Sequence, residues 1–63
     1  MCESNAYLVT DGVEELLMES VDYIRPERGQ ILLRSIFGEE KLVNAELSEM
    51  SLTGHRIILK TSV

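Results

Sequence analysis

Turn signals recur along this chain every dozen residues or so, and this spacing limits what the chain can fold into. They lie at residues 10–12, 25–29, 37–40 and 53–55, and each contains a glycine. Asp11-Gly12 is a strong hairpin signal because both residues tolerate a positive φ. Pro26 presets φ at the second position of a turn, and Gly29 can close that turn. Turns this closely spaced leave little room for long helices and predict a series of short strands.

The segments between these turns are candidate strands. They cover residues 6–9, 13–18, 21–25, 30–36, 41–47 and 56–60. Residues 43–48 alternate cleanly between apolar and polar side chains, which is the period of a strand. Two triplets, Leu17/Val21/Ile24 and Val43/Leu47/Met50, instead have the i, i+4, i+7 spacing of a helix face. Periodicity therefore leaves residues 13–24 ambiguous, and the close spacing of the turns favours strands.

These features predict a mainly β fold in a single domain spanning residues 1–63. We expect a small barrel-like meander of about six to seven short strands, SH3/Sm-like, because closing the sheet removes exposed edges. A core in a chain of 63 residues rarely supplies more than about 3–5 kcal/mol. A single cysteine excludes an internal disulfide. We therefore expect a homodimer, a bound metal, or both as additional stabilisation.

The charge balance narrows the possible partners. Eleven acidic and six basic residues give a net charge of −5, which repels phosphate backbones and makes nucleic acid an unfavourable partner. A small RNA-binding module remains the alternative, with the arginines at 25, 28, 34 and 56 as its candidate cations. The sequence contains no apolar run of about 18 residues and no secretory signal. A lone free thiol then indicates a cytoplasmic location. We expect no membrane among the partners of the protein.

Catalytic patterns are weak throughout. The chain has one cysteine and one histidine, Cys2 and His55, and no motif provides a third group to orient the base. It has no glycine-rich phosphate loop and no histidine pair at helical spacing. The paired glutamates at 14–15 and 39–40 flank turns and are typical of solvated faces. We expect a binding protein and not an enzyme.

Cys2 is the candidate metal ligand. It follows Met1 directly, and a small second residue normally permits removal of the initiator methionine. Cys2 would then carry a free α-amine and a thiol, with reference pKa values of about 7.7–8.0 and 8.5, which close a five-membered chelate ring on one ion. A thiolate with nitrogen donors in a square plane suits Ni(II) or Cu(II).

Several details of this metal site stay open on spacing alone. The backbone amide of Glu3 could add a nitrogen donor, and two chains could share one ion through two amine–thiolate pairs. His55 is a weaker candidate ligand, because an imidazole after Gly54 is typical of an exposed loop. A single cysteine near a terminus can also be incidental, which would leave a pure assembly domain.

Three segments resemble the CooT family of small nickel-binding proteins: "MCESNAYL" at the start, "ILLRSIFGEEKLV" in the middle and "HRIILK" near the end. The family is associated with nickel maturation of carbon monoxide dehydrogenase and has also been catalogued as predicted RNA-binding. The resemblance implies a barrel-like homodimer that binds Ni(II) through Cys2. It thus predicts a cytoplasmic nickel-binding accessory protein or metallochaperone, with carbon monoxide dehydrogenase or its maturation proteins as candidate partners.

Overall fold

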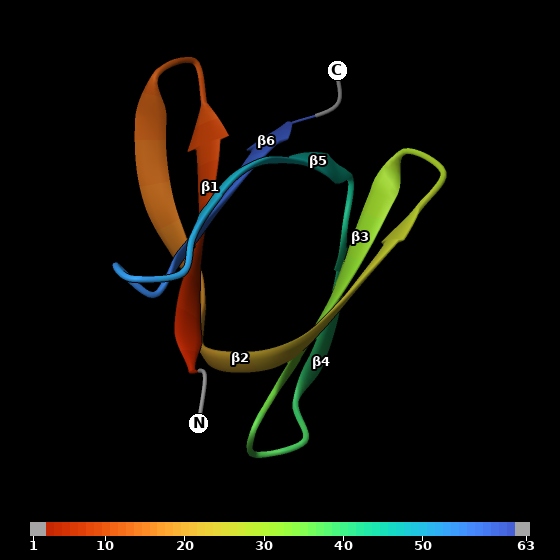
Figure 1. Ribbon diagram of the computed structural model, residues 1–63. Helices are drawn as coiled ribbons and strands as arrows, with labels where there is room; N and C mark the ends of the chain where they lie inside the picture. Colours follow the sequence, from red (N-terminus) through yellow and green to blue (C-terminus); the bar gives the residue numbers. More distant parts are fainter. Residues whose placement is uncertain (1–2, 62–63) are drawn as a thin grey trace.

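The protein forms one antiparallel-rich β-sheet that curls into a half-barrel (Figure 1). A computed structural model describes residues 3–61. The strands are β1 (Ser4–Thr10), β2 (Val13–Glu27), β3 (Gln30–Ser35), β4 (Glu40–Val43), β5 (Ala45–Ser51) and β6 (Arg56–Thr61). Their order in the sheet is β4-β3-β2-β1-β6-β5. Sheet neighbours follow one another along the chain except at β1 and β6, which pair in parallel.

Strand β2 bends the sheet. Its first half pairs with β1 and its second half pairs with β3. Between the two halves, Ala6 lies opposite Met18 and Ser4 lies opposite Val21, so β2 contains an extra residue at this point. Ser20, inside this bulge, has a positive φ of 55°. A bulge bends its strand and increases the local twist, which carries β2 from one side of the half-barrel to the other (Figure 1).

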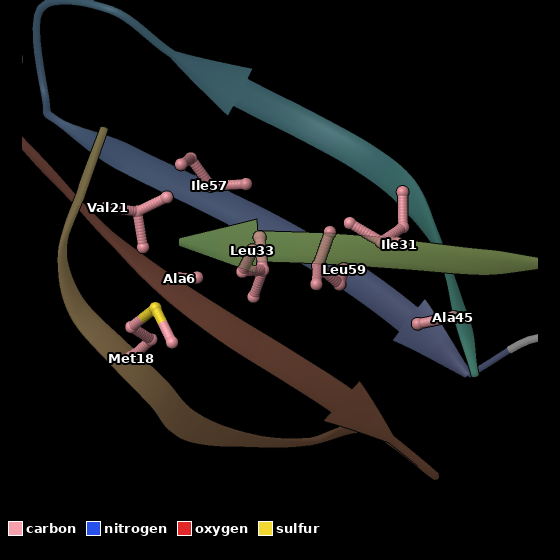
Figure 2. Close-up of a cluster of buried hydrophobic side chains, with 8 residues drawn as sticks. All are labelled: Ala6, Met18, Val21, Ile31, Leu33, Ala45, Ile57 and Leu59. Atoms are coloured by element: carbon pink, nitrogen blue, oxygen red, sulfur yellow. The ribbon is translucent and has the colours of Figure 1, made fainter. Parts of the chain in front are cut away.

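The core fills the concave side of this bend (Figure 2). It consists of Ala6, Met18, Val21, Ile31, Leu33, Ala45, Ile57 and Leu59. Ile31 and Leu33 on β3, like Ile57 and Leu59 on β6, are two residues apart, as the alternation of a strand requires. Leu8, Leu17, Ile24 and Val43 pack around this cluster from its margin. Strand β4 contributes only this marginal contact to the core.

Buried Ser35 holds the turn between β3 and β4. Its Oγ accepts hydrogen bonds from the backbone N–H groups of Phe37 (3.1 Å) and Glu39 (3.3 Å). The backbone N–H of Ser35 also donates to the Glu39 carbonyl at 2.9 Å. Gly38 lies inside this turn at a φ of 87°, a conformation that glycine adopts without strain. Buried polar groups need such partners, so this serine fixes the position of Phe37.

The mainly β, barrel-like fold predicted from the sequence is confirmed, but two strand boundaries were wrong. The segments 13–18 and 21–25 are one strand, because the bulge at Ser20 bends β2 without ending it. The segment 41–47 is two strands, because the chain leaves the sheet at Asn44 between β4 and β5. Residues 3–61 contain no helix long and apolar enough to cross a membrane.

The bulge also explains the helix-like spacing in this region. Met18 and Val21 are both buried although they are three residues apart. In a regular strand they would face opposite sides of the sheet. The extra residue restores Val21 to the core side. A second register shift, between Val21 and Tyr23, lets Ile24 pack against the core as well, so the spacing of Leu17, Val21 and Ile24 imitates a helix within a strand.

We expect Leu33→Ala to lower the free energy of unfolding by about 2–5 kcal/mol, because it removes buried methyl groups and leaves a cavity. Leu33 is fully buried, whereas Leu42 on the neighbouring strand is 53% exposed. The matched change Leu42→Ala should therefore alter stability by no more than about 0.5 kcal/mol. Urea unfolding followed by circular dichroism measures both. Equal losses in the two variants would contradict the core described above.

Candidate functional site

The start of β1 and the turn before β6 lie side by side. The two strands are parallel, with Asn5 opposite Arg56. The backbone N–H of Asn5 donates to the carbonyl of His55 at 3.0 Å. Cys2 precedes Asn5 by three positions in the sequence and lies outside the described residues. The weaker candidate ligand His55 therefore lies beside the start of β1.

The side chain of Asn5 connects this end to the bend in β2. Its Oδ1 accepts a hydrogen bond from the backbone N–H of Ser20 at 3.2 Å. The carbonyl of Ser20 in turn accepts one from the backbone N–H of Ile36 at 2.9 Å. Asn5 thus joins the first strand to the bulge, and Ser20 joins the bulge to the β3–β4 turn. Sequence reasoning missed this residue, and its only signal is that asparagine is depleted in strands.

The turn that carries His55 is held by its own residues. Ser51 Oγ accepts a hydrogen bond from the backbone N–H of Gly54 at 3.0 Å. A Cβ at position 54 would lie 2.9 Å from that oxygen, so the close approach favours glycine. His55 has a positive φ of 55° and is exposed, as its place after a glycine indicated. Its backbone carbonyl accepts the hydrogen bond from Asn5, while its imidazole is exposed to solvent.

The described part of the chain does not assemble a complete metal site by itself. Within residues 3–61, no three histidine, cysteine, aspartate or glutamate side chains come together in a group that could hold an ion. The prediction of nickel binding by Cys2 falls on a residue outside this range and stays a prediction. A site at this end would need donors from residue 2, from the backbone, or from a second chain.

The arginines proposed as RNA contacts already have neighbours. Glu27 lies 2.9 Å from the Arg25 guanidinium and raises the pKa of Arg25, with a smaller contribution from Tyr23. Arg34 lies over the ring of Tyr23, with its guanidinium carbon 4.5 Å from the ring centroid.

Arg56 has two such neighbours. It stacks 4.7 Å from the Tyr7 ring centroid and pairs with Glu14. The three arginines at 25, 34 and 56 thus face acidic or aromatic partners on β1 and β2, and not one shared groove.

These features define a small all-β domain in which the start of β1 meets the turn before β6, with no cluster of metal-binding side chains among residues 3–61. The sequence profile of the family described as "CO dehydrogenase accessory protein CooT" matches residues 1–60. The crystal structure of a CooT protein from Carboxydothermus hydrogenoformans is similar, with a TM-score of 0.87 and 38% sequence identity. That match covers 95% of this chain and 97% of the other. None of the curated proteins matches the chain.

The chain belongs to the CooT family, as the resemblance of its segments indicated. Family membership supports an accessory role connected with CO dehydrogenase. The expectation that the chain is not an enzyme stays a prediction.

We expect Asn5→Ala to lower the free energy of unfolding by about 1–3 kcal/mol, because it leaves the half-buried N–H of Ser20 without its acceptor. The amide of Ser20 should also exchange faster with solvent. Asn44→Ala is the matched control, since Asn44 Oδ1 accepts only an exposed hydrogen bond, at 2.9 Å from Gln30 Nε2. It should cost no more than about 0.5 kcal/mol. If the two variants behave alike, Asn5 does not hold the bend.

Proposed function

We propose that this protein is a cytoplasmic nickel-binding accessory protein, acting as a metallochaperone, that binds Ni(II) through Cys2. The observation that carries the proposal is the family match over residues 1–60, which includes the only cysteine of the chain. The family is described as accessory to CO dehydrogenase. We place carbon monoxide dehydrogenase or its maturation proteins as the recipients of the metal.

The ligands follow from the chemistry of a cysteine at the start of a chain. With Met1 removed, the thiolate and α-amine of Cys2 form a five-membered chelate ring that suits Ni(II). Amine and thiolate supply only two donors. Because residues 3–61 offer no further cluster, the other donors come from the backbone amide of Glu3, from a second chain, or from His55. Sharing one ion between two chains provides two such pairs.

The surface supports a homodimer that would bring two chain starts together. Leu52, in the turn after β5, is 75% exposed, and Met50 at the end of β5 is 44% exposed. Exposed apolar side chains of this size are typical of interaction sites. The same turn ends at His55, which is bonded to Asn5. An interface through Leu52 would therefore lie near the start of β1 in both copies.

RNA binding is the weaker alternative for this surface. Phosphate contacts require clustered and available cations. The chain carries a net charge of −5, and the guanidinium groups of Arg25 and Arg56 are paired with glutamates. These charges favour a metal or a protein partner over a phosphate backbone.

We expect two different changes at residue 2 to abolish nickel binding. Cys2→Ser removes the thiolate and leaves the amine, while an N-terminal acetyl group or extension removes the amine and leaves the thiol. Binding by the native chain should weaken steeply as pH falls below neutrality, because both donors must lose a proton to coordinate. Titration with Ni(II), followed by the thiolate-to-nickel charge-transfer band, measures all three effects.

The unfolding transition of each variant is the control, since a terminal residue contributes little to the core. Mass spectrometry should show that the active chain begins at Cys2. If Cys2→Ser binds Ni(II) as tightly as the parent, the site lies elsewhere, and His55→Ala is then the first variant to test.

We expect sedimentation equilibrium at micromolar concentration to give twice the chain mass. Leu52→Asp should shift the equilibrium toward monomer, because it places a charge in the proposed interface. Leu42→Asp is the matched control, since Leu42 is also exposed but lies on β4. A monomer at every concentration, with and without Ni(II), would exclude the homodimer.

A further inference from the structure

The first half of β2 has an open edge. It pairs with β1 on one side, from Val13 opposite Thr10 to Met18 opposite Ala6. On its other side, pairing with β3 begins only at Val21, opposite Ser35. Before that point, no strand within residues 3–61 lies against this edge. This edge is open because the bulge at Ser20 turns β2 toward β3 only after the first half of the strand.

A hydrogen bond shows which backbone groups face the open edge. The Leu17 carbonyl accepts a hydrogen bond from Lys41 Nζ at 3.2 Å, an exposed contact from across the edge. In an antiparallel strand, the N–H and C=O of one residue point to the same side, and residues two apart repeat this direction. The N–H of Asn5 points to β6, so the backbone groups of Leu8 point to β2, and those of its partner Glu15 point back to β1. Glu14 and Leu16 therefore present their backbone groups to the open edge, beside the carbonyl of Leu17, where the register shifts. Unpaired strand edges are templates for another extended chain.

A hollow of about 290 Å³ runs along this edge. Residues 16–19 of β2 form one wall, and Phe37 with residues 39–41 forms the other. Phe37 is 76% exposed, although its backbone N–H is fixed by Ser35 Oγ. Leu16 is 51% exposed. The hollow thus combines a strand edge with two apolar side chains that lack cover in the described chain.

The rim of this hollow is acidic. Glu19, Glu39 and Glu40 line it, against a single cation, Lys41. The ammonium group of Lys41 is already bonded to the Leu17 carbonyl. The whole chain adds a net charge of −5. A segment that carries lysine or arginine fits this field, whereas an acidic segment is repelled.

We propose that this hollow binds an extended basic segment of a partner protein by strand addition to the open edge of β2. The backbone of the segment pairs with Glu14 and Leu16, its apolar side chains contact the side chains of Phe37 and Leu16, and its cations face the glutamates. A second copy of this chain fits poorly, since it would bring the same carboxylates against each other. The inference goes beyond nickel binding and does not depend on it.

The test uses the full-length, metal-free, isotope-labelled protein and a synthetic peptide of about six residues, the usual length of a strand, that alternates lysine and valine. At saturation, amide exchange of Glu14 and Leu16 should slow by at least about tenfold, because their N–H groups become hydrogen-bonded. Phe37→Ala should weaken peptide binding by about tenfold, as loss of an aromatic anchor does. Leu42→Ala, exposed but outside the hollow, should bind like the parent.

Three results would overturn the proposal. The first is equal binding of a peptide that alternates glutamate and valine. The second is undiminished binding when proline replaces every valine of the basic peptide, which would show charge attraction without strand pairing. The third is concentration-dependent protection of the Leu16 amide without peptide, which would identify a second copy as the occupant. None of these measurements involves nickel or Cys2, so their failure leaves the metal proposal intact.

Discussion

The hydrogen bond from Ser20 to the side chain of Asn5 is the contact on which the rest of this structure depends. It stabilises the extra residue in β2, and that residue lets a single long strand serve two neighbours in turn. The curvature of the sheet, the position of the β3–β4 turn and the open edge before the bend all follow from it. The same asparagine also joins the start of β1 to the His55 turn through its backbone. Asn5 therefore stabilises both the bend of the sheet and the end of the sheet at which the candidate site is proposed.

The sequence predicts this fold well where local chemistry decides it. Asp11-Gly12 and Gly29 mark turns because they take a positive φ, and both lie in turns of the structure. The bulge was not predictable by the same means, because it depends on Asn5 contacting a residue 15 positions away. A long-range hydrogen bond leaves no periodic trace in the chain. Its indirect trace, the helix-like spacing of apolar residues, was visible but had more than one explanation.

The candidate site likewise has one part that the sequence predicts and another that it does not. The sequence predicts a ligand at position 2 because a terminal amine next to a thiol is chemistry that needs no fold. The sequence could not predict the surroundings of the candidate site. His55 lies in the segment that is hydrogen-bonded to Asn5 because β1 and β6 pair in parallel. Strands that pair in parallel here are separated by about the length of the chain, and no local motif announces such a partner.

That parallel pair has a consequence for the order of events in the cell. Strand β1 is synthesised before the other strands that the structure describes, and its partner β6 is synthesised after them. Contacts so distant in sequence form slowly, because a large loop must close before they contribute. The end of the sheet at which Asn5 meets His55 is completed only after β6 has emerged. A nascent chain without β6 therefore lacks this end, and any ligand that requires it is bound only after β6 has emerged.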